Sequence, residues 1–384
     1  MSTMAIRGLL AHSSAIVALP FLSLAVMAII VGCVVALVNR SKAGERFAMR
    51  IWLAAAVLIV LAFAVAWRLA IREENAASSN EAARNVVLYC AQDQVFAEPI
   101  LAEFNRRTGL RVKPVFDSEA VKTVGLANRL LAEREHPICD VFWGNEEFRT
   151  RQLAASGVFR ATNGWAAFGQ RSRRLVVNTK VISNQSSVRQ TASAPPTDSL
   201  NTASLITPPA SLIELTNSRW RGRVSIAFPL FGTTSTHLNA LRQHWGESNW
   251  LVWCRALAAN QPFIEEGNSH VVQRVARGEA WAGLTDSDDI ESGRREGLPV
   301  AALPLTPELL LIPNTVAVIR DAPHPTAAQK LFDYLQSATV RDQLVRAAAL
   351  ETDTPSPSTL QPDWTRLLRD LDRTTGQLKE VFRR

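Results

Sequence analysis

The pattern of hydrophobic positions divides the chain into an apolar beginning and a mixed remainder. Residues 15–38 contain no charged side chain, and neither do residues 51–67. The second stretch extends to residue 71 if Arg68 directs its charged end toward the interface. Because a helix needs about 20 apolar residues to cross a bilayer, the sequence predicts transmembrane helices at about 15–38 and 51–71.

The loop between these stretches, residues 39–50, carries four basic residues and one acidic residue. Short basic loops stay in the cytoplasm, so residues 1–72 are predicted to anchor the chain in the inner or cytoplasmic membrane as a hairpin. Everything after Arg72 would then lie on the periplasmic or extracellular side. A cleaved signal peptide and a lipoprotein site at Cys33 are alternatives. The second apolar stretch and the apolar residues after Cys33 favour the uncleaved hairpin.

After a polar stalk at residues 73–84, short apolar runs alternate with amphipathic stretches. This alternation is typical of an α/β protein whose parallel sheet is covered by helices on both faces. The predicted strands are 86–89, 111–116, 140–143, 175–178, 223–228, 279–284 and 315–319. The predicted helices include 95–108, 120–134, 237–245, 250–259, 271–277, 327–337 and 364–382.

Two segments interrupt or follow this alternation. Residues 183–209 are rich in Ser, Thr and Pro and are predicted to form a flexible surface insertion. Residues 351–384 begin with a Pro/Ser/Thr linker and end in a helix that is expected to pack back on the folded part.

The charge and the cysteines exclude several classes of protein. The chain of 384 residues has a formal net charge of +7, but seven basic residues and one acidic residue lie in residues 1–72 alone. The remainder is nearly neutral, so no nucleic-acid partner is expected. The four cysteines are widely spaced and form no CxxC motif, which argues against a structural zinc site and a disulfide framework.

Polar side chains follow several predicted strands, where the carboxyl ends of parallel strands meet and ligands collect. These side chains are Gln92, Asp93, Asn145, Glu146, Asp286, Asp288 and Asp289. Carboxylates brought together repel one another unless a cation joins them, so a hard metal ion or an ammonium group would suit the site. The candidate metal ligands are Asp93, Glu146, Asp288 and Asp289. The alternative is that these residues only cap helices and turns.

Two further segments are suited to an anion. Hydroxyl and amide side chains precede or begin predicted helices at Thr233, Thr234, Ser235, Asn268 and Ser269. Free backbone N–H groups at helix N-termini favour phosphate, carbonate or carboxylate. Ordinary helix capping is again the alternative.

Several spaced motifs resemble the bacterial extracellular solute-binding proteins of the ferric-ion ABC importer type. They lie at residues 87–94, 123–126, 140–143, 231–234, 267–269, 278–279 and 312–316. The resemblance covers residues 85–350. It implies a two-lobed periplasmic-binding-protein fold of the second type, with a hinge between the lobes. It also implies delivery of a captured solute to an ABC permease and its ATPase, with no enzymatic activity.

The resemblance does not extend to the iron ligands. Two adjacent tyrosines typical of ferric-binding members correspond to Asp288 and Asp289, and the histidine of the first loop corresponds to Asp93. The expected ligand is therefore a small cationic or zwitterionic solute. It is either a metal ion such as iron with a synergistic phosphate or carbonate, or a molecule such as an aminophosphonate. No cofactor is required.

Two other functions remain open. A membrane-anchored ligand-sensing receptor would use the same fold, although only the short loop at residues 39–50 would face the cytoplasm. A metal-dependent hydrolase could use the cluster at Asp286, Asp288 and Asp289. The sequence contains no nucleophile elbow, His-rich metal motif or phosphate loop that would support an enzyme.

Overall fold

The computed structural model describes residues 57, 58, 60–72, 84–116, 122–182, 206–351 and 359–383. The chain forms two compact units, Met1–Ala82 and Ala83–Arg384. In the first unit, the described residues are helical and most of their side chains are exposed. Within the described residues, no helix has both the length and the apolar character that a bilayer crossing requires. The predicted span at 15–38 lies outside the described residues, as do parts of the span at 51–71.

The second unit contains a mixed sheet of nine strands with the order β2-β1-β3-β9-β4-β7-β5-β6, in which β8 pairs with β4. The strands are β1 (Asn85–Cys90), β2 (Arg111–Phe116), β3 (Val141–Gly144), β4 (Trp165–Asn178), β5 (Val224–Ala227), β6 (Phe263–Glu265), β7 (Ala282–Asp286), β8 (Val300–Ala302) and β9 (Leu311–Val318). Strands β2, β1 and β3 are parallel, and so are β7, β5 and β6.

The sheet is not parallel throughout, because β4 and β9 run against their neighbours. The first part of β4 pairs with β9 as far as Ser172, and from Arg173 onward β4 pairs with β7. One strand therefore belongs to two lobes and changes partner between Ser172 and Arg173. The predicted crossing strand at 175–178 is confirmed, but it begins at Trp165.

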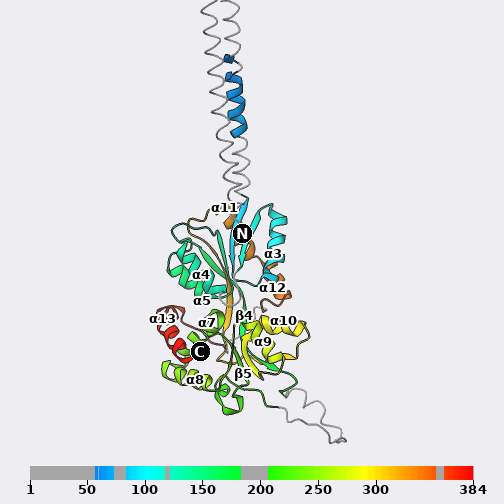
Figure 1. Cartoon of the computed structure of the whole chain (residues 1–384), viewed down its shortest axis with the longest axis vertical. Coiled ribbons are helices and arrows are strands. Elements are labelled where there is room, and N and C mark those ends of the chain that lie inside the picture. Colours follow the sequence, from blue (N-terminus) through cyan, green and yellow to red (C-terminus); the bar gives the residue numbers. More distant parts are fainter. Residues whose placement is uncertain are drawn as a thin grey trace, which may run out of the picture. The chain divides into compact units, whose positions relative to one another are not determined.

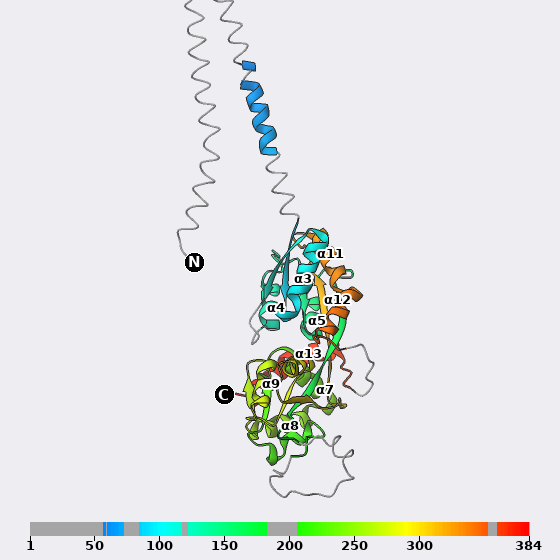
Figure 2. The same ribbon diagram turned by 90° about the vertical axis from the view of Figure 1, so that its right-hand side faces the viewer.

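Helices cover the sheet in both lobes (Figures 1 and 2). The first lobe carries α3 (Gln94–Thr108), α4 (Lys122–Ala132), α5 (Glu147–Ala155), α11 (Pro325–Leu335) and α12 (Ala338–Arg346). The second carries α7 (Gly232–Trp245), α8 (Glu247–Ala259), α9 (Asn268–Ala276), α10 (Ser287–Arg295) and α13 (Trp364–Val381). Short 3₁₀ turns lie at Ile213–Thr216 and Ser218–Trp220.

The two-residue period of a strand determines which core each of its side chains enters. In β1, Leu88 and Cys90 face a core formed with α3, α11 and α12, while Tyr89 faces a core formed with α4. Burial on both faces explains why this strand is a continuous apolar run. The C-terminal helix α13 packs Leu367 and Leu371 into the main core of the second lobe, as its spacing predicted.

Gly144, the last residue of β3, lies where no side chain fits. A Cβ atom there would collide with Thr315 Oγ1 and would approach Thr150 Oγ1 to 2.8 Å. These two hydroxyls share a buried hydrogen bond of 2.7 Å. We expect Gly144→Ala to lower the free energy of unfolding by about 1–3 kcal/mol in urea titrations, because the core there has no room to relax.

The matched control is Gly376→Ala in α13, where an added Cβ meets no atom within 4 Å. It should be neutral or stabilise by up to about 1 kcal/mol, because alanine favours helix more than glycine does. Equal effects of the two substitutions would contradict the packing described for Gly144.

Candidate functional site

Strand β4 places two arginines on one face at the junction of the lobes. Side chains alternate along a strand, so Arg171 and Arg173 point to one side of the sheet, and Ser172 and Arg174 point to the other. The side chains of Arg171 and Arg173 are only 4% and 0% exposed. Two buried guanidinium groups require carboxylates nearby to offset the loss of hydration.

Asp286, at the end of β7, supplies the first carboxylate. Arg173 Nη1 donates to Asp286 Oδ1 at 2.6 Å, and Arg171 Nε donates to Oδ2 at 3.2 Å. Thr233 and Asn268 also donate to Oδ2, at 2.8 and 3.1 Å. Burial works to raise the pKa of Asp286, but the two arginines and these hydrogen bonds hold it below its usual range. Asp286 is therefore a buried, charged and fully hydrogen-bonded group.

This arrangement uses part of the two segments that were predicted to bind an anion. Helix α7 begins at Gly232 rather than near residue 237, so Thr233 and Thr234 lie in its first turn. Thr233 and Asn268 hydrogen-bond to Asp286, and both also accept hydrogen bonds from Arg173, at 3.2 and 2.9 Å. Thr234 accepts from Arg173 at 3.3 Å. The carboxylate bound by these first-turn side chains of α7 and α9 therefore belongs to Asp286 of the protein itself, and not to a ligand.

Asp288 is the second buried carboxylate at the junction. It lies in the first turn of α10, is 5% exposed, and places Oδ1 3.4 Å from Arg171 Nε. No hydrogen-bond partner of that oxygen is found in the part of the chain that the structure describes. Burial raises the pKa of Asp288 to about 7; Arg171 opposes this rise, and the charges of Asp286 and Asp93 add to it.

Carboxylate oxygens of Asp286, Asp288 and Asp289 lie within 4.8 Å of one another. That spacing would allow one cation to contact all three groups. Among the described residues, the predicted metal ligands Asp93 and Glu146 are not part of this group. Three of the predicted site carboxylates therefore lie together, and Asp286 is the one held by arginines; their role as ligands stays a prediction.

A polar connection continues from this group into the first lobe. Arg171 Nη1 donates to Asn314 Oδ1 at 3.3 Å, and Asn314 Nδ2 donates to Gln92 Oε1 at 2.8 Å. Asp93 follows Gln92 directly. Burial works to lower the pKa of Arg171, but the charges of Asp288, Asp286 and Asp93 raise it. The loop after β1, strand β9 and strand β4 thus meet at one place.

Glu146 joins the two lobes at a neighbouring point. Its side chain accepts from the backbone N–H groups of Phe148 and Arg149, at 2.7 and 3.0 Å, and so caps α5. Thr236 of α7 donates to the same carboxylate at 3.0 Å. Burial raises the pKa of Glu146, and these contacts work against the rise. Glu146 therefore caps a helix, which is the alternative that the sequence offered to a metal role.

Three other predicted ligand-binding residues are less directly placed. Ser235 is buried within α7, Ser269 lies in the first turn of α9, and Asn145 is half-buried between β3 and α5. Their roles stay predictions.

The sequence-based prediction missed Arg171 and Arg173. The signal was available, because they are alternate positive charges at the start of an apolar run.

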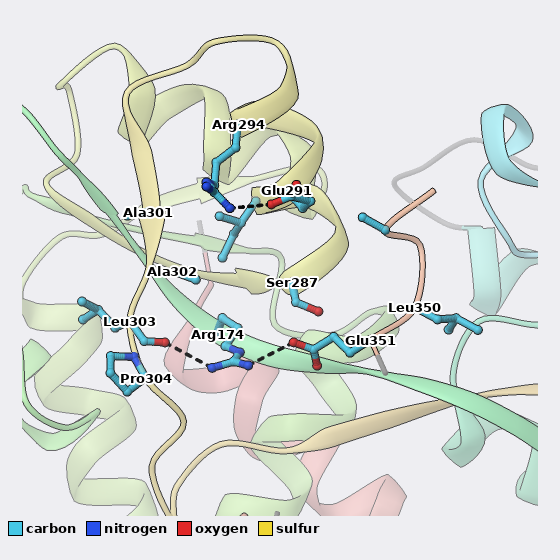
Figure 3. Close-up of a pocket in the computed structure, with 12 residues that line it drawn as sticks. Arg174, Ser287, Glu291, Arg294, Ala301, Ala302, Leu303, Pro304, Leu350 and Glu351 are labelled. Atoms are coloured by element: carbon cyan, nitrogen blue, oxygen red, sulfur yellow. Dashed lines mark hydrogen bonds and ion pairs between the residues drawn. The ribbon is translucent and has the colours of Figure 1, made fainter. Parts of the chain in front are cut away.

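The opposite face of β4 borders a cavity of about 510 Å³ (Figure 3). Arg174 donates there to Leu303 O at 3.3 Å and to Glu351 Oε1 at 3.0 Å. Arg294 pairs with Glu291 on α10 at 2.7 Å. Each of these charges at the cavity is thus paired with another group of the protein.

The fold and this junction define a two-lobed binding protein. A family model described as bacterial extracellular solute-binding protein matches residues 86–347, and the chain belongs to that family. No curated protein matches the sequence.

Solved structures agree on the fold. Iron-bound HitA from Pseudomonas aeruginosa is 19% identical, with a TM-score of 0.62 over 78% of this chain and 99% of that one. A Trichodesmium protein in complex with iron and citrate is 14% identical, with a TM-score of 0.59 over 78% and 100%. AfuA from Actinobacillus pleuropneumoniae with bound fructose-6-phosphate is 16% identical, with a TM-score of 0.60 over 77% and 98%.

The raised pKa of Asp288 predicts a specific pH dependence of stability. A carboxyl that binds its proton more tightly when folded stabilises the fold at low pH and loses that contribution as pH rises through its folded pKa. We expect the free energy of unfolding to fall by up to about 4 kcal/mol between pH 4 and pH 7 because of this group. Urea titrations of wild type and Asp288→Asn across that window should show a smaller fall in the variant.

Asp372→Asn is the control, since Asp372 is exposed on α13. Its pH profile should match that of the wild type. A fall in stability that persists unchanged in Asp288→Asn would contradict the buried position of Asp288.

Proposed function

We propose that the protein is the substrate-binding component of an ABC importer and captures a small solute that presents a positive charge. The observation that carries this proposal is the buried Asp288 Oδ1, which has no hydrogen-bond partner among the described residues. Burying a carboxylate oxygen without a partner is costly, so such a group favours a site completed by a ligand. Asp289 and Asp286 lie beside it.

The proposed ligand binds between the lobes, with its cationic part at Asp288 and Asp289. A metal ion with a synergistic anion is one candidate, and structural relatives were solved with iron or with iron and citrate. A zwitterion such as an aminophosphonate is the other. An anionic part of the ligand would find fewer hydrogen-bond donors, because Thr233 and Asn268 already hydrogen-bond to Asp286. Transfer of the solute to a permease with a cytoplasmic ATPase completes the proposed role.

The double substitution Asp288→Asn with Asp289→Asn tests this site. Full-length protein purified in detergent is expected to retain its solute, which native mass spectrometry and elemental analysis would identify. The variant should bind that solute at least 100-fold more weakly in calorimetric titrations, because two charges that face the cation are removed. Asp372→Asn is the control and should bind as the wild type does. Unchanged affinity in the double variant would refute the proposed site.

We extend the proposal to the membrane anchor. The helix at residues 60–72 exposes large apolar side chains, among them Leu61, Phe63, Val65 and Leu69, each more than half exposed. Apolar side chains over such a helix are suited to a lipid environment. Together with the basic loop at residues 39–50, this supports a hairpin that holds the binding lobes on the extracytoplasmic side.

Membrane fractionation tests the anchor. The full chain should remain in the membrane pellet after washing at alkaline pH, whereas a variant that lacks residues 1–72 should move to the supernatant. Protease added to the outside of spheroplasts should digest the second unit. Recovery of the full chain in the wash would contradict a transmembrane hairpin.

A further inference from the structure

Arg171 brings a permanent positive charge to the place where a bound cation would lie. Its Nε atom is 3.2 Å from Asp286 Oδ2 and 3.4 Å from Asp288 Oδ1. The charges of Asp93 and Asp289 act on it as well. The guanidinium is buried on a strand that belongs to both lobes, and its Nη1 is bonded to Asn314. It is therefore a fixed part of the site.

This position penalises a highly charged ligand. A metal ion bound to Asp288 Oδ1 would lie about 2.4 Å from that oxygen, and so within about 6 Å of Arg171 Nε. At that distance and an effective dielectric constant of about 20, repulsion weakens binding roughly 100-fold for each unit of ligand charge. In free energy, the repulsion from Arg171 is about twice as large for a divalent ion, and about three times as large for a trivalent ion, as for a singly charged group.

The remaining acceptor suits a hydrogen-bond donor. Asp288 Oδ1 is buried and, apart from its ion pair with Arg171, has no hydrogen-bond partner among the residues described, and an ammonium N–H could donate to it at about 2.8 Å. An anion in the same place would face the carboxylates of Asp286, Asp288 and Asp289. Arg171 and Arg173 offset two of these three carboxylates, so the group can hold one more positive charge.

We infer that Arg171 is a specificity-determining residue, which makes the site select an organic ammonium ion of single charge over a metal ion. This inference rests on the proposed function, because it assumes that a solute binds at Asp288. Arg171 then supplies the positive charge that a metal would otherwise supply, and the ligand donates a hydrogen bond to Asp288 Oδ1.

Calorimetric titration of the full-length protein in detergent tests the inference with ethanolamine, choline and Mn²⁺ as probes. Wild type should bind ethanolamine at least ten-fold more tightly than choline, which carries the same charge without an N–H group. It should bind Mn²⁺ more weakly than ethanolamine. Arg171→Gln should raise the affinity for Mn²⁺ at least ten-fold, which corresponds to about 1.4 kcal/mol.

Two variants serve as controls. Arg174→Gln removes a charge from the opposite face of the same strand, where Arg174 pairs with Glu351, and should not increase Mn²⁺ binding. Arg171→Lys retains the charge and should continue to exclude Mn²⁺. If Arg171→Gln does not fold, the wild-type titrations and Arg171→Lys still decide.

Wild-type binding of Mn²⁺ as tight as that of ethanolamine would overturn the inference and leave the proposed function standing. Unchanged Mn²⁺ affinity in a folded Arg171→Gln would also overturn it. If none of the three probes binds the wild type, the inference fails. Failure of the proposed function is distinct: the solute that co-purifies would then bind the Asp288→Asn, Asp289→Asn variant unchanged.

Discussion

The structure depends on the interaction of Asp286 with Arg171 and Arg173 at the point where β4 passes from one lobe to the other. Each of these groups would be very unfavourable if buried alone, and together they offset one another's loss of hydration. Because β4 pairs with β9 up to Ser172 and with β7 from Arg173, the two arginines fix the chain where it changes partner. Removal of Asp286 would leave both guanidinium groups buried without the carboxylate that they share.

The rest of the site is arranged around this interaction. The N-termini of α7 and α9 direct Thr233 and Asn268 to Asp286, and Asn314 links Arg171 to Gln92 of the first lobe. A second connection joins the lobes where Thr236 of α7 donates to Glu146 of α5. Polar groups that lie at strand and helix ends thereby connect the two lobes. Relative motion of the lobes would have to stretch or break these hydrogen bonds.

Much of the fold was predictable from the sequence because it depends on local periodicity. The apolar run of β1, the left-handed Gly109 that ends α3, and the leucine spacing of α13 each specify an element without knowledge of the rest. The antiparallel course of β4 and β9 was not predictable in this way. Strand direction is set by which lobe each end enters, and that is a property of the assembled chain.

The candidate site was predicted in part for the same reason. The positions of Asp286, Asp288 and Asp289 follow from the end of one strand and the first turn of one helix, so the sequence brought them together. The arginines that hold Asp286 come from a strand more than 100 residues earlier. Without that pairing, the sequence alone suggested a more acidic site than the structure contains. Asp93 and Glu146 follow strands β1 and β3, but Glu146 directly precedes α5, so its side chain caps that helix and contacts α7.

A crystal structure of the full-length protein with the solute that it retains during purification would test this site most directly. We expect density for a positively charged group within hydrogen-bond distance of Asp288 Oδ1, with Arg171 still paired to Asp286. A solute found beside Arg174 on the other face of β4, or one whose anionic group replaces Asp286 at Thr233 and Asn268, would contradict this expectation.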